Sequence, residues 1–535
     1  MSTRPSITRI DRDRTELLER LREATELLEQ VAADRGLLAD LASEERRRLL
    51  QAAGSVFHPD PAERRRLVKT IERVRRGDKA QRDDELLAET GIRALRRQPV
   101  FTTPRAFAPT TFEAHDVPPA ESDEQTARAA DAPEPSVESR ACYVCKNRYS
   151  TVHHFYDRLC PACGDVSFFK RTELADLSGR VALLTGGRVK IGYQAGLKLL
   201  RAGAHLVVTT RFPRDSAKRY AQEPDFEQWG HRLEIFGLDL RHTPSVEAFC
   251  HVLSEKYSRL DYIVNNACQT VRRPPDFYAH MMEDEAASLR SMPAHQRKLL
   301  GSYEGLRGYH LLPESGDRPP TLEWLEEQAV ELAGLTHAAQ LSQVPLLPEE
   351  FRAQKDLFPV GRLDQDLQQI DLRGRNSWRL LMAEVSSVEL LEVQLVNAIA
   401  PFVLNARLKP LMLRTPERDK HIVNVSAMEG QFYKSFKTTR HPHTNMAKAA
   451  LNMMTRTAAT DYEQDGIHMN SVDTGWVTDE DPAEIAARKV ADHRFHPPLD
   501  IVDGAARIVD PIITGVNTGE HVWGQFLKDF RPTDW

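Results

Sequence analysis

The sequence predicts an α/β domain with a doubly wound parallel sheet, preceded by a four-cysteine ribbon and an all-helical N-terminal region. Three observations carry this prediction. From about Leu177 onward, short apolar runs alternate with helical stretches, as in βαβ units. Four of the six cysteines fall within one short window. Residues 11–98 are rich in Arg, Glu, Leu and Ala, and their apolar positions follow a helical period.

Composition limits the classes of protein to which the chain can belong. Its 535 residues suggest several structural units at roughly 150 residues each. A net charge of −6, from 72 basic and 78 acidic residues, argues against a nucleic-acid binder held by phosphate contacts. No run approaches the roughly 18 consecutive apolar residues of a membrane span. The N-terminus lacks the apolar segment of a secretory signal, so a cytoplasmic protein is expected.

The N-terminal region, residues 1–98, is predicted to be helical. Its first helix carries one apolar stripe at alternating spacings of four and three residues, made of Leu17, Leu21, Ala24, Leu28 and Val31. Two interpretations remain open: a small bundle that packs on itself or on the rest of the chain, which so short a stripe favours, and a coiled coil that dimerises or binds a partner. Residues 99–140 show little periodicity and are predicted to form a flexible linker.

Residues 141–175 are predicted to form a zinc ribbon. Two C-x2-C pairs, separated by fourteen residues, supply the ligands Cys142, Cys145, Cys160 and Cys163. Four thiolates match the tetrahedral preference of Zn²⁺, and a closed set leaves no position for substrate, which indicates a structural ion. His153 and His154 lie between the pairs and remain alternatives for one ligand. Chance clustering or a redox dithiol pair is disfavoured in a reducing compartment.

Residues 176–535 are predicted to form the α/β domain. Strands are expected at 181–184, 206–209, a run ending at Asp239, 262–264, 422–425 and 469–472. Helices are expected at 193–202, 246–256, 385–413 and 444–461. From about 270 to 385 the rhythm is lost, which indicates an insertion at the C-terminal edge of the sheet, where ligands bind in such folds. That insertion is interpreted as a lid or as a surface embellishment.

A glycine-rich turn closes the first strand and opens a helix, which is the context of a phosphate-binding site. Gly186 permits the tight turn, and Gly192 permits close packing of helix on strand. The N-terminus of the helix offers free N–H groups and a partial positive charge to a pyrophosphate.

This turn resembles that of the short-chain dehydrogenase/reductase family, whose pattern there is T-G-x3-G-x-G. Thr185, Gly186 and Gly192 match, whereas Lys190 replaces the middle glycine. A basic residue at that place also occurs in pteridine-reductase-like members, which favour NADPH. The resemblance covers residues 177 to 270 and 385 to about 530, and it implies a Rossmann-type sheet, oxidoreductase activity and a homo-oligomer.

The end of the second strand bears on the choice of cofactor. NAD-specific members of the family place an acid there to hold the ribose hydroxyls, but this strand ends at Arg211. An arginine at this strand end can pair with a 2′-phosphate, and Arg188 and Lys190 add positive charge nearby. NADP(H) is therefore expected in preference to NAD(H).

Further positions match the family in chain order. Asp239 and Leu240 correspond to the adenine site, and Gly475 and Thr478 to the segment that closes over the nicotinamide. The resemblance implies these nucleotide contacts: Thr185, Gly186, Arg188, Lys190, Ile191, Gly192, Arg211, Asp239, Leu240, Asn266, Ala267, Lys448, Gly475 and Thr478.

The catalytic positions depart from the family. Lys448 matches the lysine of Y-x3-K, and Asn397 matches the asparagine that supports it through water. Thr444 stands where the family has its tyrosine, and Ala427 where it has its serine, with Ser426 one place away. A threonine hydroxyl does not readily replace a phenol, because its pKa is far higher and its reach is shorter. Thr444 remains a candidate catalytic position, and the candidates for another proton donor are Tyr433, His441, His443 and Asp473.

Two functions remain open at this point. The first is an NADP(H)-dependent oxidoreductase that has an unusual proton donor, a large lid and a small-molecule substrate of unknown identity. The second is a catalytically inactive NADP(H)-binding sensor or scaffold that engages a protein partner through the ribbon and the N-terminal helices. A ribbon that binds nucleic acid is a weak third, resting on Lys146, Arg148, Arg158, Lys170 and Arg171.

Overall fold

The computed structural model describes residues 7–103, 136–306, 337–352, 354–433 and 437–535. The chain divides into two compact units, Met1–Arg82 and Asp83–Trp535. Most of the predicted linker, residues 104–135, and part of the predicted insertion, residues 307–336, lie outside the described residues.

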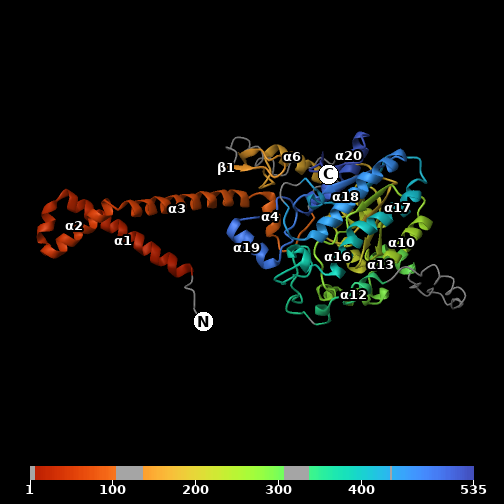
Figure 1. Cartoon of the computed structure of the whole chain (residues 1–535), viewed down its shortest axis with the longest axis horizontal. Helices are drawn as coiled ribbons and strands as arrows, with labels where there is room; N and C mark the ends of the chain where they lie inside the picture. The colour runs from red at the N-terminus through yellow and green to blue at the C-terminus, as the bar shows by residue number, and fades with distance from the viewer. Residues whose placement is uncertain (1–6, 104–135, 307–336, 353, 434–436) are drawn as a thin grey trace, which may run out of the picture. The chain divides into compact units, whose positions relative to one another are not determined.

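The first unit is helical, as predicted. It contains α1 (Ile7–Ala33), a short 3-10 turn (Arg35–Asp40), α2 (Ser43–Phe57) and most of α3 (Pro61–Ala88), shown in red and orange in Figure 1. None of residues 16–82 is buried, and the stripe residues Leu17 and Leu21 are both 56% exposed. These residues therefore form no buried apolar core among themselves, whereas packing on the rest of the chain and pairing as a coiled coil both stay predictions.

The cysteine-rich segment follows at the start of the second unit. Two antiparallel strands, β1 (Ser136–Ala141) and β2 (Arg148–Thr151), precede α6 (Pro161–Thr172). A short helix, α4 (Gly91–Arg97), contacts this segment through two backbone hydrogen bonds, from Gly91 to His154 and from Ile92 to Phe155.

The main sheet has eight strands in the order β10-β9-β8-β7-β6-β3-β4-β5, and every neighbouring pair except β10 with β9 is parallel. The strands are β3 (Val181–Thr185), β4 (His205–Thr210), β5 (Leu233–Gly237), β6 (Tyr262–Asn265), β7 (Lys420–Ser426), β8 (Ile467–Asp473), β9 (Phe526–Lys528) and β10 (Arg531–Thr533). Strand order reverses between β3 and β6, which is the switch point where open α/β sheets bind ligands. The predicted fold class is confirmed.

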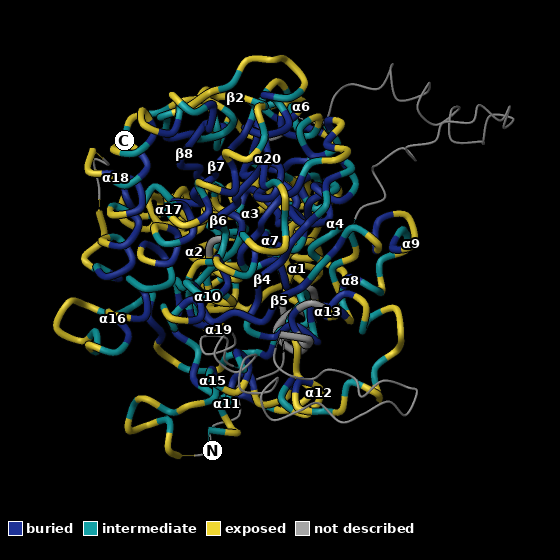
Figure 2. The backbone as a smooth tube through the Cα atoms, turned by 90° about the vertical axis from the view of Figure 1, so that its right-hand side faces the viewer, coloured by how far each residue is buried: buried dark blue, intermediate teal, exposed yellow. Residues whose placement is uncertain are grey.

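Helices cover both faces of this sheet. One face packs against α7 (Lys190–Arg201) and α20 (Ile501–Thr518). The opposite face packs against α10 (Thr243–Lys256), α17 (Ala400–Met412) and α18 (Pro442–Gln464). The strands and these core helices form the dark, buried centre of Figure 2. The observed elements begin and end within a few residues of the predicted ones, because their apolar periods are long and regular.

One continuous helix, Ser387–Met412, is by length and composition apolar enough to cross a membrane. It comprises α16 (Ser387–Gln394), a π-helical turn (Leu395–Ile399) and α17. Half of its most apolar window is buried inside the domain, where Leu404 and Leu408 pack in the core. A core helix of an α/β domain passes the same test, so this helix is weak evidence for a membrane span.

After β6 the chain forms the insertion, and the alternation of helices and strands resumes at α16, which precedes β7. The described part of this insertion holds short helices, α11 (Pro275–Tyr278), α12 (Met282–Ala286), α13 (Ala294–Leu306) and α15 (Ala338–Leu341). It contributes no strand to the sheet among its described residues. Its ends lie beside the carboxyl ends of β3, β4 and β6, where the site is found.

Candidate nucleotide-binding site and cysteine cluster

A cavity of about 1330 Å³ lies at the carboxyl ends of the parallel strands. Loops of the sheet, the insertion and the cysteine-rich segment all contribute to its wall. Every predicted nucleotide contact lines this cavity except Thr185. Thr185 is buried behind the wall, where its hydroxyl accepts a hydrogen bond from the backbone N–H of Ala267 at 3.0 Å.

The glycine-rich turn is packed too tightly for side chains. A Cβ atom on Gly192 would lie 2.2 Å from the carbonyl oxygen of Gly186 and 2.4 Å from the amide nitrogen of Asn266. Gly186 has φ +69°, and a Cβ there would lie 2.9 Å from Cα of Ala267. The Asn266 amide donates to the carbonyl oxygens of Thr185 and Gly186 at 3.0 and 3.2 Å. These contacts bring the N-terminus of α7 to the edge of the cavity.

Lys190 takes the left-handed backbone conformation, with φ 54°, at the place where the family pattern has glycine. This conformation costs an L-residue about 1–2 kcal/mol. Lys190 is the first residue of α7 and lines the cavity. Its cationic side chain therefore stands beside the free N–H groups of the helix, where an anion is favoured.

Arg211 lies at the end of β4, and a tyrosine from the insertion holds its guanidinium. The guanidinium donates to the hydroxyl of Tyr278 at 2.6 Å and lies 4.6 Å from the centre of the tyrosine ring. Burial by itself would raise the pKa of Tyr278, but Arg211 and two further arginines bring it below its usual value. Arg211 forms no ion pair with a carboxylate among the described residues. Arg188, in contrast, is paired with Asp215 at 2.6 Å.

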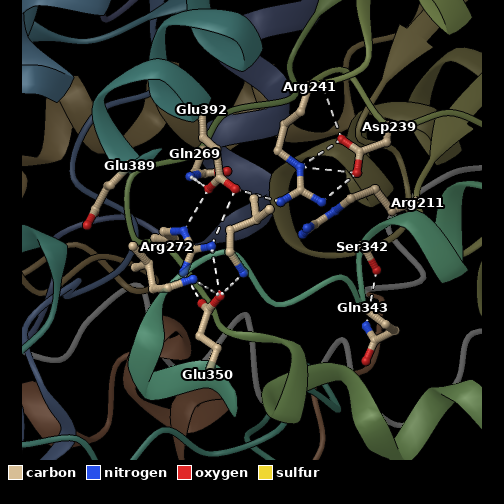
Figure 3. A network of polar contacts seen from close by, with 12 residues as sticks. Arg211, Asp239, Arg241, Gln269, Arg272, Ser342, Gln343, Glu350, Glu389 and Glu392 are labelled. Atoms are coloured by element: carbon tan, nitrogen blue, oxygen red, sulfur yellow. Dashed lines mark hydrogen bonds and ion pairs between the residues drawn. The ribbon is translucent and has the colours of Figure 1, made fainter. Parts of the chain in front are cut away.

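A charged network surrounds the predicted adenine site (Figure 3). The sequence comparison implied that the carboxylate of Asp239 meets the adenine amine, but both of its oxygens accept hydrogen bonds from Arg241. The reason is local, because Arg241 stands only two residues further along the same loop. Arg241 also pairs with Glu392 of α16 at 2.9 Å, and Glu392 pairs with Arg272 of the insertion at 2.9 Å. The network thus ties the insertion to the rim of the sheet.

At the opposite end of the cavity, Lys448 is 3% exposed and donates to the backbone carbonyl of Val425 at 2.7 Å. The side chain of Asn397 is engaged elsewhere, since its oxygen accepts from the N–H of Gln269 and its nitrogen donates to the carbonyl of Gln269. Asn397 therefore clamps the loop after β6 and does not itself line the cavity.

The structure separates the candidate proton donors. Thr444 is buried outside the wall, and Tyr433 is 85% exposed and does not line the cavity, so neither is brought to the site. His443 is buried beside Glu389, with 3.5 Å between the ring nitrogen and the carboxylate. His441 and Asp473 do line the cavity.

His441 is held in a defined orientation at the first turn of α18. Its ring stacks on that of Trp378, with 3.9 Å between ring centres and an interplanar angle of 7°. Burial lowers the pKa of His441 below its usual value. Trp378, at the end of the insertion, therefore both lines the cavity and packs against the start of α18.

Asp473, at the end of β8, is held by two contacts. One carboxylate oxygen accepts from the N–H of Gly475 at 2.6 Å, and the other pairs with Lys528 of β9 at 3.2 Å. Because of this pairing, Asp473 orients the segment that follows β8.

The four predicted metal ligands come together. The sulfur atoms of Cys142, Cys145, Cys160 and Cys163 all lie within 4.8 Å of one another. The N–H of Cys160 donates to the sulfur of Cys142 at 3.3 Å, a contact that favours a thiolate. The alternative ligands His153 and His154 do not belong to this cluster. The Nδ1 of His153 accepts from the N–H groups of Phe155 and Tyr156, and its Nε2 lies 3.3 Å from Asp165. The donor set fits a tetrahedral Zn²⁺ ion.

Several wall residues were not found from the sequence. They are Tyr143, Arg241, Tyr278 and Lys528. Tyr143 follows a metal ligand, and Tyr278 lies in an insertion without a recognisable pattern, so no local signal links either of them to the sheet.

The fold is a Rossmann-type α/β domain, with a cavity at the switch point of its parallel sheet. Residues 180–288 match the family model described as "short chain dehydrogenase", and residues 374–497 match the model described as "Enoyl-(Acyl carrier protein) reductase". The chain belongs to the short-chain dehydrogenase/reductase family of oxidoreductases.

Individual relatives differ greatly in how much of the chain they match. An uncharacterized protein of Acanthamoeba polyphaga mimivirus is 30% identical over 384 residues, which are 70% of this chain and 71% of the viral protein. The dehydrogenase/reductase SDR family member 13 of Bos taurus is 33% identical over 105 residues. Those residues are 19% of this chain and 28% of the bovine protein.

Solved structures of the family resemble the chain at lower identity. A short chain dehydrogenase from Burkholderia cenocepacia in complex with NADP is 16% identical, with a TM-score of 0.39, 66% of this chain covered and 97% of that chain. A dehydrogenase/reductase from Sinorhizobium meliloti is 17% identical with the same TM-score, 68% of this chain covered and 96% of that chain. The family assignment rests on the sequence matches.

Proposed function

We propose that the chain is an NADP(H)-dependent oxidoreductase acting on a small molecule, with a proton-transfer group other than the family's tyrosine. The observation that carries this proposal is the state of Arg211. Its guanidinium is oriented by Tyr278 beside the cavity, and it forms no ion pair with a carboxylate among the described residues. Asp239 is near enough for a charge interaction: against the effect of burial, Arg241 and, more weakly, Arg211 lower the pKa of its carboxyl. A 2′-phosphate would give Arg211 a directly paired negative charge through bidentate hydrogen bonds.

Other groups of the cavity wall favour binding of the phosphates of NADP(H). The N-terminus of α7 and Lys190 favour the pyrophosphate, and no acid stands at the end of β4 to select ribose hydroxyls. NADP(H) when bound supplies hydride transfer at its nicotinamide. A carbonyl substrate would then accept that hydride at carbon and a proton at oxygen, which gives an alcohol.

We further propose His441 as the group that moves this proton. It lines the cavity, whereas Thr444 and Tyr433 do not, and stacking on Trp378 fixes the plane of its ring. Because burial lowers its pKa, its imidazole is neutral near pH 7. A neutral imidazole accepts the hydroxyl proton in the oxidising direction, and the imidazolium, once protonated from solvent, donates a proton to the carbonyl oxygen in the reducing direction. Lys448 would hold the nicotinamide ribose, the role implied by its match to the family.

The nucleotide proposal is tested by calorimetric titration of the zinc-loaded protein with NADPH and with NADH. We expect tighter binding of NADPH, and a loss of about tenfold to a hundredfold for NADPH alone in Arg211→Ala, since a hydrogen-bonded charge contributes about 1.5–3 kcal/mol. Arg407→Ala is the matched control, because Arg407 pairs with Glu247 at the surface. Equal affinity for the two nucleotides would overturn the proposed preference.

We also propose that the cysteine cluster holds one structural Zn²⁺ ion. The closed set of four sulfur atoms supports this, because it leaves no open position for catalysis. Metal analysis should find one zinc ion per chain, and Cys145→Ser should lower that content. If the protein is purified under reducing conditions in the presence of zinc and still contains none, the proposal is contradicted.

A second function is favoured by the loss of the usual acid. Thr444 and Ala427 replace the tyrosine and the serine, and the structure brings no tyrosine of α18 to Lys448. On this basis the chain would bind NADP(H) as a sensor or scaffold without turnover, with the ribbon and the N-terminal helices engaging a partner. Nucleotide binding without oxidation or reduction across a panel of carbonyls, alcohols and pterins would support it.

Self-association is proposed as well. The support is the exposure of the large apolar side chains of residues 16–82, because an amphipathic helix is stabilised only when its apolar face is covered. Light scattering of the full chain and of a chain that starts at Asp83 should show a larger assembly for the former. The same number of chains per assembly in both proteins would contradict this proposal.

A further inference from the structure

The cysteine-rich segment contributes a side chain to the wall of the nucleotide cavity. Tyr143 directly follows the ligand Cys142, and its hydroxyl accepts a hydrogen bond from the backbone N–H of Trp476 at 2.9 Å. Tyr143 lines the cavity together with Lys146 of the same knuckle. The ring of Tyr143 also lies 5.6 Å from the amine of Lys528.

The backbone of Trp476 belongs to the segment 474–478, which follows β8 and lines the cavity. The segment lies at the end of the cavity that holds Lys448, which we call the reaction end. Two successive N–H groups of this segment are held from different parts of the chain. Asp473 accepts from the N–H of Gly475, and Tyr143 accepts from the N–H of Trp476. Gly475 has φ +75°, and a Cβ atom on it would lie 2.5 Å from Leu499 and 3.4 Å from the hydroxyl of Tyr143. The segment is thus fitted against the tyrosine.

The knuckle itself is a tight turn closed by its backbone. The N–H of Cys142 donates to the carbonyl of Asn147 at 2.9 Å, and the N–H of Lys146 donates to the carbonyl of Cys142 at 3.1 Å. Lys146 takes the left-handed conformation with φ 64°. A metal ion bound by Cys142 and Cys145 would clamp both ends of this turn, and so fix the direction in which Tyr143 projects.

The other side of the ribbon is anchored independently of the cysteines. Arg171 of α6 forms two hydrogen bonds with Asp500 of α20, at 2.6 and 3.0 Å, and also pairs with Asp503 at 3.0 Å. Tyr156 donates to Asp503 at 2.5 Å. All four side chains are buried. Loss of the metal would therefore release the knuckle while α6 stays on α20.

We propose that Tyr143 is a positioning residue that holds the segment 474–478 over the reaction end of the cavity, and that metal binding at the cysteine cluster fixes Tyr143 in that position. The inference rests on the proposed nucleotide function. It adds that the metal sets the affinity for the nucleotide through one side chain, and that the ribbon is part of the binding site.

We call the observed position of the segment 474–478, in which Trp476 donates to Tyr143, its closed position. The hydrogen bond stabilises the segment only in this position. Without it, the closed segment is less populated, and apparent affinity falls in proportion to that population. One hydrogen bond of ordinary strength corresponds to about a threefold to tenfold loss of NADPH affinity.

The experiment uses the full chain and compares Tyr143→Phe with Tyr149→Phe, each loaded with zinc and each treated with a chelator under reducing conditions. Tyr149 is the matched control, since it lies in the same ribbon and its hydroxyl donates to the carbonyl of Asp157, away from the cavity wall. Zinc content, circular dichroism, hydrogen exchange of residues 474–478 and calorimetric affinity for NADPH are measured on all samples.

In zinc-loaded Tyr143→Phe we expect full zinc content, faster hydrogen exchange in 474–478 and the threefold to tenfold loss of affinity. Chelation of the wild type should reproduce these changes, chelation of Tyr143→Phe should add little, and zinc-loaded Tyr149→Phe should behave as the wild type.

Three results would overturn the inference. They are unchanged exchange and affinity in Tyr143→Phe, a wild type insensitive to chelation, and global unfolding on chelation, which would show that the metal supports the whole domain instead of one side chain. If the zinc-loaded wild type binds no NADPH, the proposed function fails, whereas hydrogen exchange still decides the contact between Tyr143 and Trp476.

Discussion

The two ends of the cavity are built differently. At the phosphate end, consecutive residues of one turn and the end of the next strand provide the wall, and close packing excludes a side chain at Gly186 and Gly192. At the reaction end, the wall combines α18, the insertion and the cysteine-rich segment, which lie far apart in the sequence. The comparison shows that the phosphate end keeps the strand–turn–helix arrangement of the family pattern, whereas the wall of the reaction end is assembled from segments far apart in the sequence.

The largest effect on nucleotide affinity should come from the phosphate end. Gly192→Val places a side chain where even a Cβ atom would lie 2.2 Å from the carbonyl of Gly186. Overpacking of this kind costs about 3 kcal/mol, or roughly a hundredfold in NADPH affinity. Gly301→Val in α13 is the control, since a Cβ atom on Gly301 would have no other atom within 4 Å. Calorimetry that finds normal binding in Gly192→Val would show that the turn does not contact the nucleotide.

The next effect separates enzyme from sensor at the reaction end. Lys448→Met should lower NADPH affinity by only about threefold to tenfold, the effect of one lost ribose contact, and should lower kcat by about 10²–10⁴, the range of a positioned proton-transfer system. The reason is that Lys448 is buried beside Val425 at the reaction end, away from the phosphate turn. Steady-state kinetics with any substrate found in the panel measure kcat. An unchanged kcat would remove Lys448 from the mechanism.

The phosphate end could be predicted from the sequence almost completely, because each of its residues is set by a local backbone requirement. Gly186, Gly192 and Arg211 lie where the strand–turn–helix pattern places them. The reaction end could not, because its contacts join segments separated by hundreds of residues. Trp476 bonds with Tyr143, 333 residues away, without any periodicity that links them. The same limit applies at the phosphate end to the contact between Arg211 and Tyr278 of the insertion.

The predicted proton donors illustrate the same limit. Proximity to Lys448 in sequence suggested both Tyr433 and His441, yet only the second lines the cavity. The left-handed backbone of His441, with φ 44°, and its stacking on Trp378 decide this placement. Neither feature can be recognised before the insertion is placed. In the same way the apolar stripe of α1 was visible, but whether it would be covered was not.

A smaller effect concerns the proposed proton carrier. His441→Gln should lower kcat by about tenfold to a hundredfold with unchanged NADPH affinity, and Tyr433→Phe, at an exposed position, should change neither. Since burial lowers the pKa of His441, the rate of alcohol oxidation should fall as pH decreases through that lowered pKa, where the base becomes protonated. This acid limb should be absent in His441→Gln. A limb that persists would assign the proton to another group.

The smallest effect distinguishes acid sensitivity of the fold from that of the site. Three histidines lie together at the edge of the sheet opposite the cavity: the rings of His468 and His521 stack at 4.7 Å, and His421 and His521 share a hydrogen bond of 3.0 Å. Burial lowers the pKa of all three, that of His421 well below its usual value.

Below about pH 6.5 the unfolded chain therefore binds protons that the folded chain does not, so stability present at neutral pH is lost as pH falls. Urea unfolding should show a decrease of about 1–2 kcal/mol between pH 7.5 and 5.5, reduced in His421→Asn, whereas NADPH affinity of the folded protein should not follow His421. A stability that is constant over this range would mean that the cluster takes up protons without unfolding. The acid limb of catalysis would then have to be corrected for that uptake before it could be assigned to His441.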